Sequence, residues 1–208
     1  MLPLHMDRPD RRTSLSAVQQ QSPEKNRLKG RRGPRSRPSH PTVSQNQSMS
    51  QELIGVISDT HGHFDPKIPN LFKHVSHILH AGDIGKLDVL QQLERIAPVT
   101  AVSGNIDEGN VPPGVHAEQT LELGGLRIFL IHILGNPRRL SRALQQRIDG
   151  VQPDVVVFGH SHEPLIEKHG RVLYFNPGSA GPKRFSLPRS VGLLRIRHGT
   201  PHCELISL

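Results

Sequence analysis

Aspartate, asparagine and histidine recur where short apolar segments of the sequence end. Asp59 and His61 follow the segment 53–57, and Asp83 follows the segment 78–80. Further donors after later segments are Asn105, His132, His160 and His162. A single Asp or Asn after a strand is more often a turn former or helix cap, and a single His is more often an ordinary polar residue. Seven such donors at consecutive strand ends, each near glycine or another small residue, instead predict a metal site.

This mixture of oxygen and imidazole donors suits two divalent ions. Two dications roughly 3.5–4 Å apart need a shared carboxylate, and Asp83 could give one oxygen to each. Asp59 and His61 with one of His160 and His162 would complete one site. Asn105 and His132 with the remaining one of these two histidines would complete the second. Two dications with two carboxylates have a net positive charge, which would attract an anion. Donors without thiolate favour Mn, Fe, Zn, Co or Ni, and imidazoles argue against Mg or Ca alone.

The elements that must position these donors follow an α/β pattern. Strands are predicted at 53–57, 78–80 and 99–102, with helices at 67–75 and 86–96 between them, so these strands should be parallel. Gly124-Gly125 predicts a hairpin between 120–123 and 126–131. The rest predicts a helix at 137–148 and strands at 155–158, 164–167, 171–175, 192–196 and 203–206. This order favours two mixed sheets with helices outside.

Composition limits the class of protein. The chain has 208 residues, 34% hydrophobic residues and one cysteine. No apolar run approaches the roughly 18 residues that a membrane span needs, and one cysteine cannot form an internal disulfide. No secretory signal is visible at the N-terminus. We therefore expect a soluble, cytoplasmic protein without a membrane partner.

The positive charge is concentrated in the first 50 residues. They hold 10 Lys and Arg against 3 Asp and Glu, whereas the rest holds 16 against 15. Residues 1–50 also lack apolar periodicity, which predicts a disordered basic tail followed by a domain at 51–208. The tail could be a basic arm, a transit peptide or inert sequence, and the inert reading is favoured. Translation starting at Met49 would remove it, and we expect residues 1–48 to be dispensable for folding.

Several short motifs make the sequence resemble the calcineurin-like metallophosphoesterases, in their small single-domain phosphodiesterase branch. The motifs are Ser58-Asp59-Thr60-His61-Gly62, Gly82-Asp83, Gly104-Asn105, His132, Gly159-His160-Ser161-His162 and Asn176-Pro177-Gly178-Ser179. The resemblance covers about residues 52–206. It implies a four-layer αββα sandwich and phosphoester hydrolysis by a hydroxide bridging two ions, usually of the Mn type. It also implies that His162 joins Asp59 and His61, and that His160 joins Asn105 and His132, while Asn176 to Ser179 form a structural loop.

The sequence departs from that family at the residue expected to act as general acid. Many relatives carry His or Cys directly after the metal-binding Asn, where this chain has Ile106, which cannot donate a proton. Relatives also commonly have His-Gly-His where this chain has His132-Ile133-Leu134. Asp83 and Asn105 remain candidates for catalysis through the metals. His63 could replace the missing acid or contact phosphate, although a solvated loop histidine is the favoured reading.

Two functions of different classes fit these residues. The first is a metal-dependent phosphodiesterase acting on a small phosphodiester. The second is a non-catalytic protein-interaction scaffold, because a eukaryotic retromer subunit has this fold and similar motifs. That subunit has an incomplete ligand set, and the complete set here favours the enzyme. A nucleic-acid partner is disfavoured because the part after residue 50 has one Tyr and no Trp, while assembly into a homo-oligomer remains open.

Overall fold

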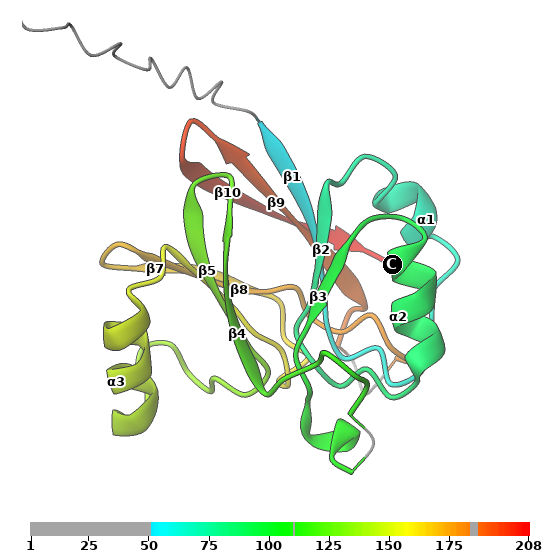
Figure 1. Ribbon diagram of the computed structural model, residues 1–208, viewed down its shortest axis with the longest axis horizontal. Helices are drawn as coiled ribbons and strands as arrows, with labels where there is room; N and C mark the ends of the chain where they lie inside the picture. The colour runs from blue at the N-terminus through cyan, green and yellow to red at the C-terminus, as the bar shows by residue number, and fades with distance from the viewer. Residues whose placement is uncertain (1–50, 110, 184–186) are drawn as a thin grey trace, which may run out of the picture. The chain divides into compact units, whose positions relative to one another are not determined.

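The computed structural model describes residues 51–109, 111–183 and 187–208, all within the unit Gln45–Leu208 (Figure 1). The predicted disordered tail at 1–50 lies outside the described residues, so its boundary with the domain stays a prediction. Within the described residues, no helix has the length and apolar character needed to cross a membrane.

One five-stranded sheet contains the first three strands, as predicted. β1 (Glu52–Ile57), β2 (His77–His80) and β3 (Val99–Ala101) are parallel neighbours, with Val56 opposite Leu79. β9 (Ser190–Arg197) pairs antiparallel with β1, and β10 (Thr200–Ser207) pairs with β9 at the edge. The order is β10-β9-β1-β2-β3. The carboxyl ends of β1, β2 and β3 therefore lie at one edge of the sheet.

The second five-stranded sheet begins with the predicted hairpin. β4 (Glu118–Leu123) and β5 (Leu126–Ile131) are antiparallel around Gly124-Gly125. β6 (Val155–Val157) and β8 (Val172–Asn176) continue the sheet parallel to β5, and β7 (Leu165–His169) closes it antiparallel to β8. The order is β4-β5-β6-β8-β7, so both sheets are mixed.

The helices are shorter than the sequence pattern predicts. α1 is Ile68–Leu71, α2 is Leu87–Glu94 and α3 is Arg142–Val151, with a 3₁₀ turn η1 at Asn105–Asp107. The prediction of a helix at 67–75 was too long: the backbone of Phe72 leaves the helical region and its ring packs over Gly55.

The predicted helix at 137–148 starts too early. The Asn136 side chain accepts a hydrogen bond from Arg138 N at 2.8 Å, which forms a turn there. Ser141 then caps α3 by accepting from Leu144 N at 3.3 Å. A turn and an N-cap serine therefore set the start of the helix.

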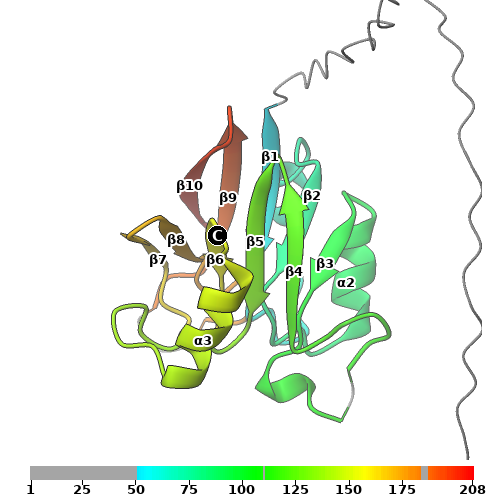
Figure 2. The same ribbon diagram turned by 60° about the vertical axis from the view of Figure 1, so that its left-hand side comes forward.

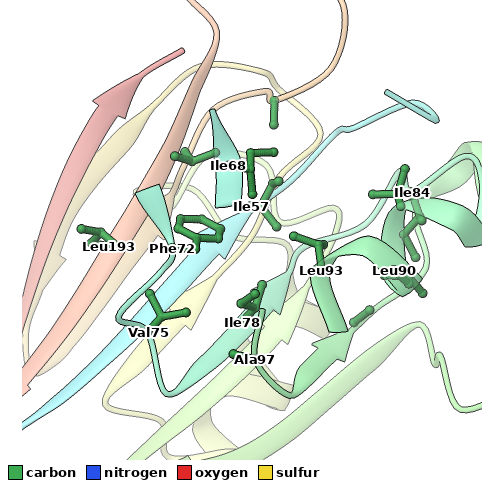
Figure 3. Close-up of a cluster of buried hydrophobic side chains, with 14 residues drawn as sticks. Ile57, Ile68, Phe72, Val75, Ile78, Ile84, Leu90, Leu93, Ala97 and Leu193 are labelled. Atoms are coloured by element: carbon green, nitrogen blue, oxygen red, sulfur yellow. The ribbon is translucent and has the colours of Figure 1, made fainter. Parts of the chain in front are cut away.

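Three buried apolar clusters separate four layers. One cluster packs α1 and α2 against the first sheet, and Figure 3 shows Phe72 and Leu93 among its side chains, with Ile57 and Ile78. A second lies between the sheets and includes Val56 and Val157. The third joins the second sheet to α3. Figure 2 shows α2 beside β3 and α3 beside β6. The predicted αββα sandwich is confirmed.

Candidate metal centre

Asp59 lies in the loop directly after β1, where its carboxylate is fully buried. Its Oδ2 accepts hydrogen bonds from Ser58 Oγ at 2.6 Å and from His160 N at 3.1 Å. Asp59 Oδ1 is the one buried side-chain oxygen or nitrogen of the described residues without a hydrogen-bond partner. His162 Nε2 lies 3.2 Å from it, without hydrogen-bond geometry. Since a buried carboxylate oxygen without a hydrogen bond is costly, this atom fits a cation ligand.

Asp59, His61 and His162 form a first group of donors. The two Nε2 atoms of His61 and His162 face one another at 3.3 Å, and the rings are tilted by 46°. One ligand atom from each of the three residues lies within 4.8 Å of the others. Two imidazoles and a carboxylate oxygen at this spacing can hold one divalent ion.

Asp83, Asn105, His132 and His160 form a second group. Asp59 lies close to it as well, since one ligand atom each of Asp59, Asp83 and His132 lies within 4.8 Å of the others. His132 Nδ1 donates to Ala81 O at 2.7 Å, which turns its Nε2 toward Asp83 Oδ1 at 3.3 Å and Asn105 Oδ1 at 3.2 Å. His160 Nδ1 lies 3.0 Å from the same amide oxygen. The backbone carbonyl of Ala81 thus fixes which ring nitrogen of His132 is offered to a ligand.

The two oxygens of Asp83 face different groups. Oδ1 lies near His132 in the second group, and Oδ2 lies 3.8 Å from His61 Nε2 in the first. A carboxylate in this position suits a ligand shared between two ions, and the shared role of Asp83 stays a prediction.

The pKa values of Asp83 and His132 favour their charged forms. Burial alone would raise the pKa of Asp83, but the His132 hydrogen bond, the Ile106 N–H and the nearby imidazoles lower it to about 2. Burial likewise opposes the charged form of His132, yet the hydrogen bond to Asp83 and the charge of Asp59 raise its pKa. The metal-free cluster therefore keeps a carboxylate beside a readily protonated imidazole.

Close packing of glycines brings the loops together. A Cβ on Gly104 would collide with Asp83, and a Cβ on Gly82 would lie 2.6 Å from His132 Nδ1. A Cβ on Gly159 would collide with Ser58 Oγ and lie 2.7 Å from Asp59 Oδ2. Side chains at these positions would push the donor-bearing loops apart.

Asp107 is a supporting residue that the sequence analysis did not identify. Its carboxylate accepts from the backbone N–H groups of Ile84, Gly85 and Gly104 at 3.1, 2.9 and 2.8 Å. It thereby ties the loop that carries Asp83 to the loop that carries Asn105. An acidic residue in the first turn after Gly104-Asn105 was the available indication.

The loop Asn176 to Ser179 contacts the backbone of the donor loops. Asn176 Nδ2 donates to Gly159 O at 3.0 Å and to Ser161 Oγ at 3.1 Å, and Ser179 Oγ donates to Asp59 O at 3.0 Å. These bonds hold the backbone of the two loops that bear the first group of donors, which agrees with a structural role.

The candidate acid and the two departures from the family pattern lie around this cluster. Within the described residues, no hydrogen bond or ion pair joins the His63 imidazole to the seven donors; its backbone N–H donates to Thr60 O at 2.8 Å. Ile106 and Ile133 follow Asn105 and His132, and their side chains are 45% and 47% exposed. The structure therefore brings the seven predicted metal ligands together and leaves His63 outside their network.

Comparison with models of protein families identifies the superfamily to which this chain is similar. The model of the calcineurin-like phosphoesterase superfamily domain matches residues 53–199, which include all seven donors. The chain belongs to this superfamily. A probable metallophosphoesterase of Methanothermobacter thermautotrophicus is 34% identical over 74% of this chain and 98% of its own length. A phosphodiesterase of Methanocaldococcus jannaschii is 29% identical over 68% of this chain and 91% of its own.

Solved structures with this fold come from both enzyme and trafficking proteins. An archaeal phosphodiesterase is 26% identical, with a TM-score of 0.59 and coverage of 75% of this chain and 99% of that one. Vacuolar protein sorting 29 of Cryptosporidium parvum has a TM-score of 0.61 at 19% identity, covering 76% of this chain and 98% of that one. The second likeness shows the shared fold alone.

Proposed function

We propose that this protein is a metal-dependent phosphodiesterase that hydrolyses small phosphodiesters at a centre of two divalent ions. We expect manganese, with iron, zinc, nickel or cobalt as alternatives. The observation that carries the proposal is the position of Asp83, whose two carboxylate oxygens face one imidazole of each donor group, His61 on one side and His132 on the other.

The protein residues would hold and orient the ions. Asp59, His61 and His162 would hold one, Asn105, His132 and His160 the other, and Asp83 would contact both. When bound, such a pair supplies an activated water nucleophile and Lewis-acid stabilisation of the phosphoryl oxygens. Two carboxylates do not neutralise two dications, so the site would attract the anionic diester.

Within the described residues, neither position considered for a general acid supplies a proton donor to the donor cluster. The position after Asn105 is an exposed isoleucine, and the His63 imidazole is outside the hydrogen-bond network of the donors. We propose that esters with a good leaving group are hydrolysed best, because their leaving oxygen needs little protonation. His63 remains the first candidate for a donor when substrate is bound.

The scaffold alternative is weaker for two reasons. All seven donors are present and face one another, which a protein-binding surface does not require. The relatives at 34% and 29% identity are named as a metallophosphoesterase and a phosphodiesterase, whereas the trafficking protein shares 19%.

Hydrolysis of a panel of nitrophenyl phosphodiesters after addition of Mn²⁺ tests the proposal. We expect turnover in the full chain, loss of turnover in Asp59→Asn, and retention in Asp88→Asn, an exposed aspartate on α2. A protein that binds Mn²⁺ but hydrolyses none of the esters would contradict the enzyme and favour the scaffold.

A further inference from the structure

A hollow of about 340 Å³ opens directly beside the second group of donors, and we call it the Ile133 hollow. Asn105 and His132 form part of its wall, together with Ile131, Ile133, Glu118 and Arg147. A larger hollow of about 500 Å³ beside Ser161 has none of the seven donors in its wall. The Ile133 hollow therefore continues from two of the candidate metal ligands, Asn105 and His132.

The wall next to His132 is apolar and exposed. Ile133 is 47% exposed, although large aliphatic side chains gain free energy by leaving water. Ala117, which is exposed, and Ile131, which is buried, also line the hollow. An apolar group placed here would cover Ile133 and remain in contact with the cluster.

The charges of the hollow disfavour a second anion. Glu108 and Glu118 both line it, against the one cation Arg147. Arg147 Nη1 already donates to Glu118 Oε2 at 2.7 Å, so its charge is paired. Counting these three side chains, the hollow carries one net negative charge and would repel an additional carboxylate or phosphate.

We propose that the Ile133 hollow binds the organic group of the ester, and that this group is an apolar aryl or short alkyl group without a second anionic charge. The volume is at the lower end of the range for small-molecule pockets, which fits a group of this size. The inference rests on the proposed function, because the metal-bound phosphoryl group would place the organic group at the hollow.

Binding of two phosphonates to the Mn²⁺-loaded full chain tests the apolar preference. By calorimetry, phenylphosphonate should bind at least about tenfold more tightly than methylphosphonate, because apolar pockets discriminate by such factors. Ile133→Asn should remove most of this preference with Mn²⁺ content unchanged. Leu205→Asn, at a similarly exposed residue of β10, should preserve it. Equal affinities in the unmodified chain, or no binding of either compound, would overturn the proposal.

A charged analogue tests the second half of the proposal. 4-Carboxyphenylphosphonate should bind more weakly than phenylphosphonate, and Glu118→Gln should narrow the difference because it frees Arg147. Glu122→Gln is the matched control, since Glu122 lies on the same strand and pairs with Arg127 at 3.2 Å. Tighter binding of the carboxylated compound by the unmodified chain would contradict the proposal.

The same preparations separate this inference from the proposed function. If the protein hydrolyses diesters but does not bind phenylphosphonate more tightly than methylphosphonate, the inference is refuted and the proposed phosphodiesterase activity is supported. A phenyl preference that Ile133→Asn removes, without hydrolysis of any diester, would refute the enzyme and support the hollow as a binding site.

Discussion

The donor-bearing loops and the hairpin turns of this protein meet the same backbone requirement with different residues. Hairpin turns place glycine at positive φ, as at Gly124, Gly125 and Gly170. The donor loops also contain such glycines, Gly62 and Gly82, but they place chemically active side chains there as well: Asp59, His61, Asp83, His160 and His162 have φ between 49° and 70°. Among the other described residues, the non-glycine residues with positive φ are Gln152 and His198.

This difference between donor loops and hairpin turns shows that backbone strain is concentrated in the donor loops. A left-handed conformation costs a non-glycine residue about 1–2 kcal/mol, and glycine would avoid most of that cost. Five of the seven candidate ligands have this unfavourable conformation. A turn that only reverses the chain could avoid the cost with glycine. Strain that clusters at one site and coincides with the donor atoms supports a functional role for these loops.

The largest expected effect comes from removing the carboxylate that faces both groups. Asp83→Ala should abolish hydrolysis and lower the Mn²⁺ content, because the two ions would lose their shared ligand. Asp83→Gly should lose the same functions while unfolding at a higher denaturant concentration than Asp83→Ala, since glycine relieves the positive φ. Metal analysis and urea titration measure both effects. An Asp83→Ala protein that keeps two ions per chain would show that Asp83 does not bridge.

Ile106→His should have the next largest effect. General acid catalysis contributes typically 10²–10⁴-fold, and mostly for poor leaving groups. The variant should hydrolyse alkyl phosphodiesters faster, with little change for nitrophenyl esters and with a new ionisation in the pH–rate profile. Similar rates on both ester types in the unmodified protein would mean that a donor is already present. Loss of alkyl-ester activity in His63→Ala, with metal content intact, would assign it to His63.

A smaller effect concerns His80, which lies beneath the donor loops. Its Nδ1 accepts from Gly82 N at 3.2 Å, and its Nε2 lies 3.0 Å from Thr60 Oγ1, which donates to Ile84 O at 3.0 Å. The ring is therefore neutral with its proton on Nε2. Burial lowers the pKa of His80 to about 4.

This lowered pKa predicts a pH dependence of folding. In the unfolded chain, His80 binds a proton near pH 6.5, whereas in the folded chain it binds one only near pH 4. The free energy of unfolding therefore falls as the pH falls from 6.5 to 4. The full loss is roughly 3 kcal/mol at about 1.4 kcal/mol per pKa unit. Urea titrations in chelator at pH 7 and pH 5 should show a smaller loss in His80→Gln than in the unmodified chain. His202→Gln, at an exposed histidine of β10, is the control, and equal losses in all three proteins would contradict the assignment.

The smallest effect tests the comparison of loops directly. His160→Gly should stabilise the metal-free fold by up to about 1 kcal/mol while weakening metal binding, since it removes strain and a donor together. His198→Gly, in the β9–β10 turn, should give a similar stabilisation with unchanged metal binding. Urea titration and Mn²⁺ calorimetry on both variants measure this. Destabilisation in both would show that positive φ is not costly at these positions.

The sequence predicted that β1, β2 and β3 are parallel and that the seven donors meet, because parallel strands place their carboxyl ends at one edge. It did not predict the end of α1 at Leu71, which depends on Phe72 packing over Gly55 from another element. Nor did it identify Asp107, whose role depends on backbone groups that come together only in the fold. Periodicity gives the elements and motifs give the donors, whereas contacts between loops require the structure.

We propose that this site holds two ions that share Asp83 as a ligand. Anomalous scattering from crystals of the full chain soaked in Mn²⁺ tests it most directly. We expect two peaks roughly 3.5–4 Å apart, with Asp83 between them. One should lie against Asp59, His61 and His162, and the other against Asn105, His132 and His160. A single peak, or two peaks without Asp83 between them, would contradict it.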